Sequence, residues 1–557
     1  MAIDHQSLYF SYEEFPFVAP PELSGNGSRH SVTIVGAGPV GLTAALALVR
    51  QGVSVTVLED EATLNIGSRA AGTARRSLEI LDSLGAAERL VDKGVAWTKG
   101  QSYYGDKLVL DFSMPVLDNV KHPPMVNLQQ CYVEQYILDE LSKSPLATVR
   151  WSSAVKAVEN CGDRVKVHVA TPDGDYELES DWLIACDGAR SVIRSSLGLR
   201  MEGTSYEGRY IVADVRLATD LPPGRRVWFD SAGNPDSTII LHRQPDNIWR
   251  IDYQLRDDED SDRELEPERV RSRIQTFLDS VGIGGPWEID WVSLYRAHSL
   301  SLKNYWHGRV LFAGDAAHLV PIFGARGMNG GIDDVFNLAW KLAYVVRGVA
   351  PPALLNTYTE ERYFAFQENI RNANKSTKVM APPTRGDLLM RDAVLELAVE
   401  HEFVRPLLNP RQSAEIFLRD SSLREPGDTT VGGLAPGQVC PNIKVSVMTD
   451  GTAETRYLHE LLGPEFTVLV QGKADGIMPE WPATMHGLGL KTIYVDRAGE
   501  TPGLSHIRDV DGAVAQAFQL MDGGAVLIRP DHHVLGRWRE GTPDVVSAAL
   551  RRVATWQ

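Results

Sequence analysis

The sequence is poor in cysteine and contains no long apolar run. Its four cysteines are scattered over 557 residues, without a C-x-x-C pair or a His-Cys cluster at metal-binding spacing. We therefore expect free thiols and no metal centre. No run of roughly 18 apolar residues occurs, so no membrane-spanning helix is expected. The first residues carry acids and prolines where a secretory signal has a basic start and an apolar core, which favours a cytoplasmic protein.

The sequence also lacks an excess of positive charge. Its 56 basic and 73 acidic residues give a formal net charge of -17, which repels the phosphates of a nucleic acid or an anionic membrane. We therefore expect neither as a partner. Hydrophobic residues make up 43% and charged residues 23% of the chain, as in ordinary globular proteins, and the length favours about two or three domains.

Near its start the sequence contains a dinucleotide-binding signature. The stretch "SVTIVGAGPVGLTAALALVRQGVSVTVLED" predicts a strand, a glycine turn, a helix and a second strand. Gly36 allows the tight turn, Gly38 lets a pyrophosphate approach the backbone, and Gly41 lets helix and strand pack closely. Glu59 ends the second strand, where an acid accepts a hydrogen bond from a ribose hydroxyl. Because these parts occur together, a nucleotide site is a better interpretation than an ordinary glycine turn.

The remaining chain divides by composition. Short strands rich in β-branched and aromatic residues, such as "STIILHR", predict a sheet inserted into the dinucleotide-binding fold. The pattern from about 70 to 145 is mainly helical. The predicted regions are an N-terminal lead (1–30), a dinucleotide-binding domain with a helical return (31–200 and 300–425), the inserted sheet (200–300) and a C-terminal α/β domain (435–557).

Two further motifs follow predicted strands. Asp187 lies in "DWLIACDGARS" and Asp315 in "GRVLFAGDAAH", and a helix begins soon afterwards at "GMNGGIDDVFNLAWKL". With the first glycine motif, this set resembles the single-component FAD-dependent aromatic hydroxylases over residues 31 to about 380. The C-terminal segment "AVLIRPDHHVLGRW" resembles the thioredoxin-like domain of the phenol hydroxylase and hydroxyphenylpropionate hydroxylase branch.

The resemblance implies an α/β fold: a Rossmann-type FAD-binding domain, an inserted β-sheet substrate domain and a thioredoxin-like C-terminal domain. It implies NADH or NADPH as a transient co-substrate beside the turn at Asp187. Surface charge is the alternative for Arg69, and Gln130 is as well explained by packing. The implied FAD-binding residues are Gly36, Gly38, Pro39, Val40, Gly41, Glu59, Arg69, Gln130, Asp187, Asp315, Gly327, Met328 and Asn329.

The chain departs from the family pattern beside the expected substrate cavity. The family commonly has a second proline and an additional glycine in the stretch that here is "VPIFGARGMN", where Ile322 and Ala325 stand instead. With Pro321, these residues are expected to shape the substrate pocket. Some phenol hydroxylases carry an active-site acid at the position of Ala71, so that route to deprotonating the substrate is missing.

The implied activity is hydroxylation of a small phenol ortho or para to its hydroxyl, with dioxygen activated as a flavin C4a-hydroperoxide, in the catabolism of aromatic compounds. Candidates in the inserted sheet are His242 and Tyr253 as catalytic residues and Arg250 in the substrate pocket. Because side chains alternate along a strand, not all three can face one cavity, and each is equally well explained as an ordinary sheet residue.

Other functions remain open at this point. A protein of the same fold could carry out other chemistry, such as epoxidation or reduction, or bind FAD without catalysis. The sequence does not specify the phenol, the position of hydroxylation or the nicotinamide nucleotide. The C-terminal domain is a candidate contact in a homodimer.

Overall fold

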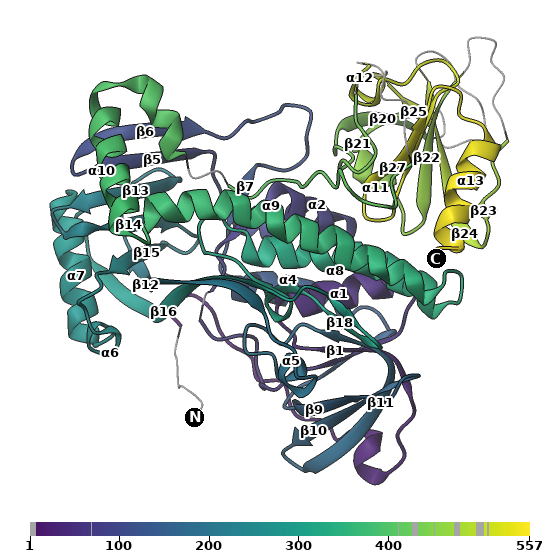
Figure 1. Cartoon of the computed structure of the whole chain (residues 1–557), viewed down its shortest axis with the longest axis horizontal. Coiled ribbons are helices and arrows are strands. Elements are labelled where there is room, and N and C mark those ends of the chain that lie inside the picture. Colours follow the sequence, from purple (N-terminus) through teal and green to yellow (C-terminus); the bar gives the residue numbers. More distant parts are fainter. Residues whose placement is uncertain are drawn as a thin grey trace.

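The computed structural model describes residues 7–67, 69–409, 412–425, 433–449, 452–472, 480–496, 506–509 and 512–557. These residues form three eight-stranded sheets and one three-stranded sheet. The long helices α8 (Gly327–Val346) and α9 (Asn356–Met380) run through the middle of the molecule, with the C-terminal domain beyond them (Figure 1). No helix of the described residues is long and apolar enough to cross a bilayer.

The first sheet contains the predicted βαβ unit. β1 (His30–Val35) pairs in parallel with β2 (Val55–Leu58) and with β11 (Gly174–Ala185), and α1 (Pro39–Arg50) connects β1 to β2. The dinucleotide-binding fold predicted from the sequence is therefore confirmed. The other strands of this sheet are β8 (Ala147–Arg150), β9 (Ala154–Asn160), β10 (Val165–Thr171), β17 (Trp306–His307) and β18 (Val310–Phe312).

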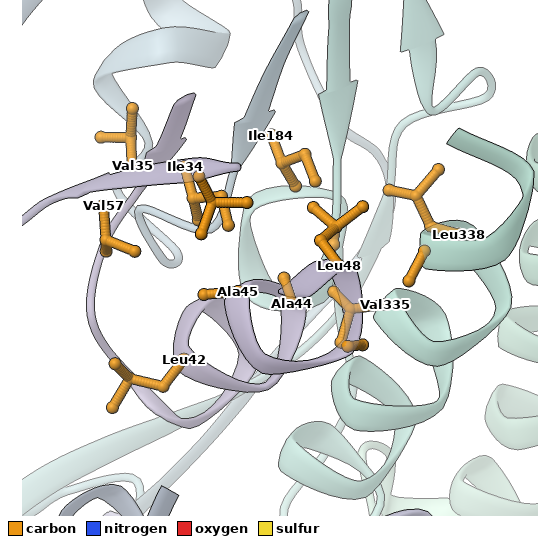
Figure 2. Close-up of a cluster of buried hydrophobic side chains, with 14 of the residues drawn as sticks. Ile34, Val35, Leu42, Ala44, Ala45, Leu48, Val57, Ile184, Val335 and Leu338 are labelled. Atoms are coloured by element: carbon orange, nitrogen blue, oxygen red, sulfur yellow. The ribbon is translucent and has the colours of Figure 1, made fainter. Parts of the chain in front are cut away.

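The apolar side of α1 fills the space between this sheet and α8. Leu42, Ala44, Ala45 and Leu48 of α1 are buried with sheet residues such as Ile34 and Ile184 on one side and with α8 residues Val335 and Leu338 on the other (Figure 2). Burying this amount of apolar side chain stabilises the junction by several kcal/mol, at about 1.5–3 kcal/mol for each large residue. The packing fixes α8 relative to the glycine turn before α1.

The second sheet is the insertion predicted over residues 200–300, with additions. Its order is β19-β16-β12-β15-β14-β13-β5-β6, and α7 (Pro267–Ser280) covers its outer face. Its strands are β5 (Lys99–Tyr104), β6 (Lys107–Ser113), β12 (Glu202–Leu217), β13 (Arg225–Ser231), β14 (Asn234–Arg243), β15 (Ile248–Leu255), β16 (Trp287–Ser301) and β19 (His318–Leu319).

The expectation of mainly helix between 70 and 145 is wrong in its middle part. Helices α2 (Arg75–Ser83), α3 (Glu88–Lys93) and α4 (Gln130–Leu141) are present. Between α3 and α4, however, β5 and β6 form a hairpin that extends the inserted sheet. Short strands β3 (Gly72–Ala74), β4 (Val95–Ala96) and β7 (Met125–Asn127) form the three-stranded sheet.

In the part that the structure describes, the N-terminal lead packs on the surface of the folded chain. Residues 1–6 lie outside the described residues. The Tyr132 hydroxyl donates to the Tyr9 carbonyl at 3.0 Å, and the Phe15 ring stacks on Trp151 with centroids 4.2 Å apart. The Gly67 N–H donates to the Tyr12 hydroxyl at 3.2 Å. The lead therefore packs against the loop that precedes Arg69.

The C-terminal domain has a mixed sheet of order β21-β20-β25-β24-β22-β26-β27, with β23 beside β24. Its elements are β20 (Lys444–Thr449), β21 (Thr452–Tyr457), α11 (Leu458–Leu461), β22 (Phe466–Gln471), β23 (Thr484–Met485), β24 (Leu488–Asp496), β25 (His506–Arg508), α12 (Ala513–Phe518), β26 (Ala525–Ile528), β27 (Val534–Trp538) and α13 (Pro543–Ala554). Before this domain, α10 (Arg385–Glu400) packs on the hairpin β5–β6.

Buried ion pairs attach the C-terminal domain to α8 and α9. Arg529 binds Glu361 at 2.6 Å, and Lys341 binds the same carboxylate at 2.6 Å. The Asn337 amide donates to Asp531 at 2.9 Å, and Arg529 also pairs with Asp531. Since these side chains are almost completely buried, the contact has the character of a domain core and not of a loose tether.

Candidate cofactor and substrate site

The glycine turn before α1 is shaped for close approach of a ligand. Gly36 has φ of +101°, and a methyl group on it would lie 2.5 Å from the Cys186 carbonyl oxygen. A methyl group on Gly41 would lie 1.9 Å from the Gly36 carbonyl oxygen. Gly38 caps α1, and Pro39 occupies the first turn, where its missing N–H costs nothing. The helix therefore presents its free N–H groups and positive dipole end to an anion.

Glu59 lies at the end of β2, beside this turn. Its carboxylate accepts hydrogen bonds from the Ala37 N–H at 2.5 Å and the Glu61 N–H at 3.2 Å. Burial, with a contribution from Asp60, raises the pKa of Glu59 to about 8. A hydroxyl donor from a ligand would stabilise this carboxylate, as the ribose role predicts.

Arg69 and Gln130 both lie beside the glycine turn before α1, but their side chains differ in their contacts. Arg69 is exposed, and its guanidinium forms no hydrogen bond or ion pair with the described residues. The Gln130 side chain accepts from the Ala70 N–H at 3.1 Å and donates to Glu134 at 2.8 Å. Gln130 therefore holds the backbone next to Arg69. Of these two side chains, Arg69 is the one that can bind a phosphate without giving up a contact with the described residues.

Glu134 is a residue of this site that the sequence analysis missed. It is fully buried on α4 and accepts from the Asn65 N–H at 3.1 Å and from the Asn65 amide at 2.9 Å. Burial raises its pKa to about 7, although Gln130, Asn65 and the charge of Arg69 act in the opposite direction. Its position four residues after Gln130 on a helix was the available signal.

The second glycine-rich stretch packs against the first. Gly314 has φ of +56°, and a methyl group on Gly331 would lie 2.5 Å from a Val40 methyl group and 3.1 Å from Gly314 Cα. A methyl group on Gly327 would lie 4.0 Å from the carboxylate of Asp315, which is exposed. Desolvation by the surrounding chain raises the pKa of Asp315, and the charges of His318 and Arg69 lower it in part. Asp315, Gly327 and Arg69 thus border one region.

A buried charged cluster holds the turn at Gly314. The Asp334 carboxylate accepts from the Gly314 N–H at 3.1 Å and lies 2.6 Å from His318 Nε2, while Arg362 donates to its other oxygen at 2.7 Å. Burial alone would raise the pKa of Asp334, but His318 and Arg362 lower it to about 2. The sequence analysis did not identify this pair of His318 with an acid on α8.

Asp187 and Asn329 mainly organise backbone. One Asp187 oxygen accepts from the Ile193 N–H at 3.0 Å, while the other has no partner among the described residues. The Asn329 amide donates to the Gly72 and Ala325 carbonyls at 2.8 and 2.6 Å, and its oxygen accepts from the Ala74 N–H. Met328 beside it is half-buried. Asn329 thus joins the start of α8 to β3.

A polar row crosses the inner face of the inserted sheet. Arg225, His242, Arg250 and Asp214 are directly paired across β13, β14, β15 and β12. Arg250 binds Asp214 through two hydrogen bonds at 2.8 and 2.9 Å and donates to the Arg69 carbonyl at 2.8 Å. Arg250, predicted in the substrate pocket, is therefore engaged with protein and supports the loop that carries Arg69. The polar row therefore extends across the sheet from Asp214 and Arg250, beside the Arg69 loop, to Arg225.

The two catalytic candidates lie on opposite faces of this sheet. His242 Nε2 lies 3.6 Å from the Asp252 carboxylate on the inner face. Tyr253 is buried on the outer face beneath α7, with the Arg273 guanidinium over its ring. Burial lowers the pKa of His242, with Asp252 opposing this effect. Because side chains alternate along β15, Tyr253 cannot join His242 and Asp252, and we do not retain it as a catalytic candidate.

The departures from the family pattern lie where the second glycine stretch meets β3. Ala325 has φ of +54°, a left-handed conformation that favours glycine. Its β-carbon would be 3.3 Å from a methyl group on Gly72, and it packs beside Trp97 and Met125. Pro321 is buried and Ile322 is partly buried in a cluster shared with the inserted sheet. These residues lie between the start of α8 and the sheet, and their part in a substrate pocket stays a prediction.

The residues present fit FAD. One end of the site offers a bare helix N-terminus, the Glu59 carboxylate and the Arg69 guanidinium, which has no partner in the described chain. The other offers Asp315 and the start of α8. Because the two glycine stretches pack against each other, one extended dinucleotide can contact both.

Comparison with protein families matches residues 29–373 to the FAD binding domain and residues 437–553 to the HcaD C-terminal domain. Among curated proteins, the chain is 27% identical over 544 residues to the 3-(3-hydroxy-phenyl)propionate/3-hydroxycinnamic acid hydroxylase of Klebsiella pneumoniae, covering 94% of each chain. It is 31% identical to the protein of that name from Mycolicibacterium smegmatis over 366 residues, 65% of this chain and 64% of that one.

Solved structures show the same fold. The flavin-dependent monooxygenase PieE, in complex with FAD and substrate, matches with a TM-score of 0.78 at 22% identity, covering 95% of this chain and 99% of that one. The p-nitrophenol 4-monooxygenase of Pseudomonas putida matches with a TM-score of 0.59 at 26% identity, covering 70% of this chain and all of that one. The chain therefore belongs to the FAD-binding domain family, and within it the protein is an FAD-dependent flavoprotein monooxygenase.

Proposed function

We propose that the enzyme hydroxylates a phenolic ring ortho or para to its hydroxyl, with NADH or NADPH and dioxygen as co-substrates. The relatives named for hydroxyphenylpropionate and for p-nitrophenol support a phenolic substrate. The observation that carries the proposal is the pair of His242 and Asp252 on the inner face of the sheet, in the row that also supports the Arg69 loop.

The chain's own residues hold the cofactor at several atoms. We assign the pyrophosphate to the N-terminus of α1 and Arg69, the adenosine ribose to Glu59, and the ribityl side to Asp315. The positive dipole end of α8, at Gly327–Gly330, would stabilise negative charge on the bound ring system by roughly 1 kcal/mol. When bound, FAD reduced by the nicotinamide activates dioxygen for transfer of one oxygen atom to the aromatic ring.

His242 accepts the phenol proton. Its pKa lies below the ordinary 6.5 because of burial, so the imidazole is neutral and can accept a proton at neutral pH. Asp252 stabilises the resulting imidazolium and orients the ring. Removing the proton makes the phenol a better nucleophile, and the buried sheet face keeps water from competing. Ala71, where some phenol hydroxylases have an acid, has no part in this step.

Exchanging His242 tests this assignment. In His242→Gln, kcat/KM for a phenol should fall about 100-fold or more. The loss of activity that we expect of wild type at acid pH, when His242 becomes protonated below its ordinary pKa of 6.5, should disappear. His298→Gln, the same exchange on β16 of the same sheet, is the control and should behave as wild type. An unchanged acid limb in His242→Gln would exclude His242 as the proton acceptor.

We further propose a fold for the C-terminal domain, an oligomeric state, a place for the nicotinamide co-substrate and a cellular location. The C-terminal domain is thioredoxin-like, supported by its mixed sheet flanked by helices, and Cys440 is a buried free thiol with no redox role. The same domain is the proposed contact of a homodimer. The nicotinamide co-substrate binds transiently beside Asp187, and the enzyme works in the cytoplasm, consistent with four free cysteines.

A further inference from the structure

Glu134 is a buried acid at the place where the cofactor pyrophosphate approaches the chain. It lies on α4, and its exposed fraction is 0%. A methyl group on Gly38, the second glycine of the first motif, would lie 4.0 Å from a carboxylate oxygen of Glu134. In the dinucleotide-binding fingerprint this glycine is the one that lets the pyrophosphate approach the backbone. The carboxyl group of Glu134 therefore borders the space that the phosphates enter.

The contacts that hold this carboxyl group are all with hydrogen-bond donors. One oxygen accepts from the side-chain amides of Asn65 at 2.9 Å and of Gln130 at 2.8 Å. The other oxygen accepts from the Asn65 backbone N–H at 3.1 Å. An N–H group cannot accept a hydrogen bond, so none of these contacts would receive a proton carried by Glu134. A protonated Glu134 could donate that proton to an oxygen of a ligand.

The charges around Gly38 favour a neutral Glu134 once FAD is bound. The doubly charged pyrophosphate faces the single positive charge of Arg69 and the N-terminus of α1, which is equivalent to roughly half a positive charge. A neutral Glu134 leaves about half a negative charge unbalanced, whereas an ionised Glu134 leaves about one and a half. Because the side chain is fully buried, water does not screen the repulsion between its carboxylate and the phosphates.

The free protein holds Glu134 close to the midpoint of its titration. Burial raises the pKa of Glu134 to about 7, and its side-chain donors and the charge of Arg69 oppose this rise. The protonated and ionised forms are then similarly populated at neutral pH. An anion that binds beside the group is therefore enough to decide which form is present.

The ionisable groups next to Glu134 remain in one charge state. Burial, with a contribution from Glu134 itself, raises the pKa of the Cys131 thiol to about 12. Burial also raises the pKa of Tyr12 in the N-terminal lead, which lies beside Cys131. The first turn of α1 has no ionisable side chain. The cations of α3 that reach towards α4 are engaged in pairs of their own, Arg89 with Asp139 and Lys93 with Asp246.

Three other acids border the cofactor site. Glu59 has a pKa of about 8, and a ribose hydroxyl that donates to its carboxylate would lower this pKa and release a proton. This change is opposite to the one expected at Glu134. Burial raises the pKa values of Asp187 and Asp315. All three acids are the same in wild type and in a Glu134 variant, so their contributions cancel when the two proteins are compared.

We propose that FAD binding is coupled to proton uptake at Glu134, whose neutral carboxyl group then donates a hydrogen bond to a phosphate oxygen of the cofactor. A hydrogen bond from a hydroxyl to an anionic oxygen is about twice as strong as one between neutral groups. Since up to one proton is taken up for each FAD, the affinity should fall by up to about tenfold per pH unit above pH 7. This inference concerns the cofactor and does not rest on the proposed phenol hydroxylation.

The test is calorimetric titration of the FAD-free protein with FAD at about pH 8, in two buffers of different ionisation enthalpy. The difference in heat gives the number of protons taken up per FAD. Wild type should take up about one half to one proton more than Glu134→Gln, whose amide does not titrate. Between about pH 6.5 and 8.5, the FAD affinity of wild type should fall roughly 10-fold relative to that of the variant.

Glu140→Gln is the matched control, because it makes the same exchange near the C-terminal end of α4. Glu140 pairs with Arg50, the last residue of α1, at 2.8 Å, away from the glycine turn. This variant should keep the proton number and the pH dependence of wild type. Equal proton uptake by wild type and Glu134→Gln, or an equal pH dependence of their FAD affinities, would overturn the inference.

If Glu134→Gln does not bind FAD, Glu59→Gln decides the question. This variant lacks the acid expected to release a proton and retains Glu134. Its proton uptake per FAD should rise through pH 7 towards one as the free protein loses the proton of Glu134. Absence of uptake, or uptake that does not rise through this range, would show that Glu134 is not the group that becomes protonated.

Discussion

Gly331 of α8 lies directly against Val40 of the first glycine motif, because a methyl group on Gly331 would come 2.5 Å from a Val40 methyl group. The same methyl group would stand 3.1 Å from Gly314 Cα. Three stretches that are far apart in the sequence therefore meet at one point. This contact places the start of α8 beside the first glycine motif, so that one cofactor could meet the N-termini of both α1 and α8, which would account for two glycine-rich stretches in one site.

The first prediction concerns this contact. Gly331→Ala should lower FAD content strongly, because the new methyl group pushes α8 away from Gly314 and Val40. The measurements are the FAD-to-protein ratio after purification and the affinity of the protein for added FAD. Gly386→Ala, where the nearest atom to the new methyl group is 3.8 Å away, should retain FAD as wild type does. Full FAD occupancy in Gly331→Ala would contradict the packing described.

The second prediction concerns the strained alanine beside the pocket. Ala325 has φ of +54°, which costs an alanine about 1–2 kcal/mol more than a glycine. Glycine loses about 0.4–1 kcal/mol through the entropy of the unfolded chain, so Ala325→Gly should gain up to about 1 kcal/mol of unfolding free energy. The same exchange at Ala393, on exposed helical backbone, should instead lose about 1 kcal/mol. Equal losses in denaturant titrations of both variants would show that Ala325 is not strained.

The third prediction concerns the ion pairs between α9 and the C-terminal domain. Glu361→Gln leaves Lys341 and Arg529 without their shared carboxylate, all three being almost completely buried. Removing one partner of a buried pair costs about 3–5 kcal/mol, which denaturant unfolding should show. Arg371→Gln breaks an exposed pair with Glu368 on the same helix and should cost less than about 1 kcal/mol. A similar small cost for both would mean that the domain contact contributes little.

The fourth prediction concerns pH and stability. The rings of His459 and His532 lie 4.2 Å apart at the domain contact, and burial lowers the pKa of His459 to about 3. The unfolded chain therefore binds a proton at His459 below its ordinary pKa of 6.5, where the folded chain does not. The stability that neutral His459 confers is complete above pH 6.5 and is lost as pH falls toward 3, at about 1.4 kcal/mol per pH unit.

The measurement for this prediction is a difference between variants. Buried acids with raised pKa values, such as Glu59 and Glu134, change stability in the opposite direction over part of this range. Comparing wild type with His459→Gln at several pH values cancels these contributions. Wild-type stability relative to the variant should fall as pH decreases below 6.5, and a constant difference would show that folding leaves the pKa of His459 unchanged.

Local patterns predicted the cofactor half of the molecule well. The strand, glycine turn, helix and terminal acid at residues 31–59 depend on backbone sterics and short-range packing, so one sequence window contains the information. The hairpin of β5 and β6 was missed because its place in the inserted sheet comes from parallel pairing with β13, more than 100 residues later. Such a pairing leaves no local signal in the polar stretch "KGQSYY".

The substrate half could be predicted less completely, for a different reason. Alternation along β15 correctly placed Arg250 and Tyr253 on opposite faces of the sheet. It did not predict which of the two faces lies toward the cofactor site. That depends on α7 covering the outer face and on Arg250 reaching the Arg69 carbonyl. Arg225 was not identified, because in "RRVWFD" an arginine at a strand start is typical of a surface position, whereas in the fold it is only 4% exposed.

The central claim is that the protein, loaded with FAD, inserts one atom of dioxygen into a phenol. The most direct test is turnover with isotopically labelled dioxygen, a hydroxyphenyl acid and NADH or NADPH, followed by mass spectrometry of the product. The account predicts one labelled oxygen in a newly formed ring hydroxyl, with one nicotinamide consumed for each product. Nicotinamide oxidation that yields only hydrogen peroxide with every phenol tested, or a product whose new oxygen comes from water, would contradict it.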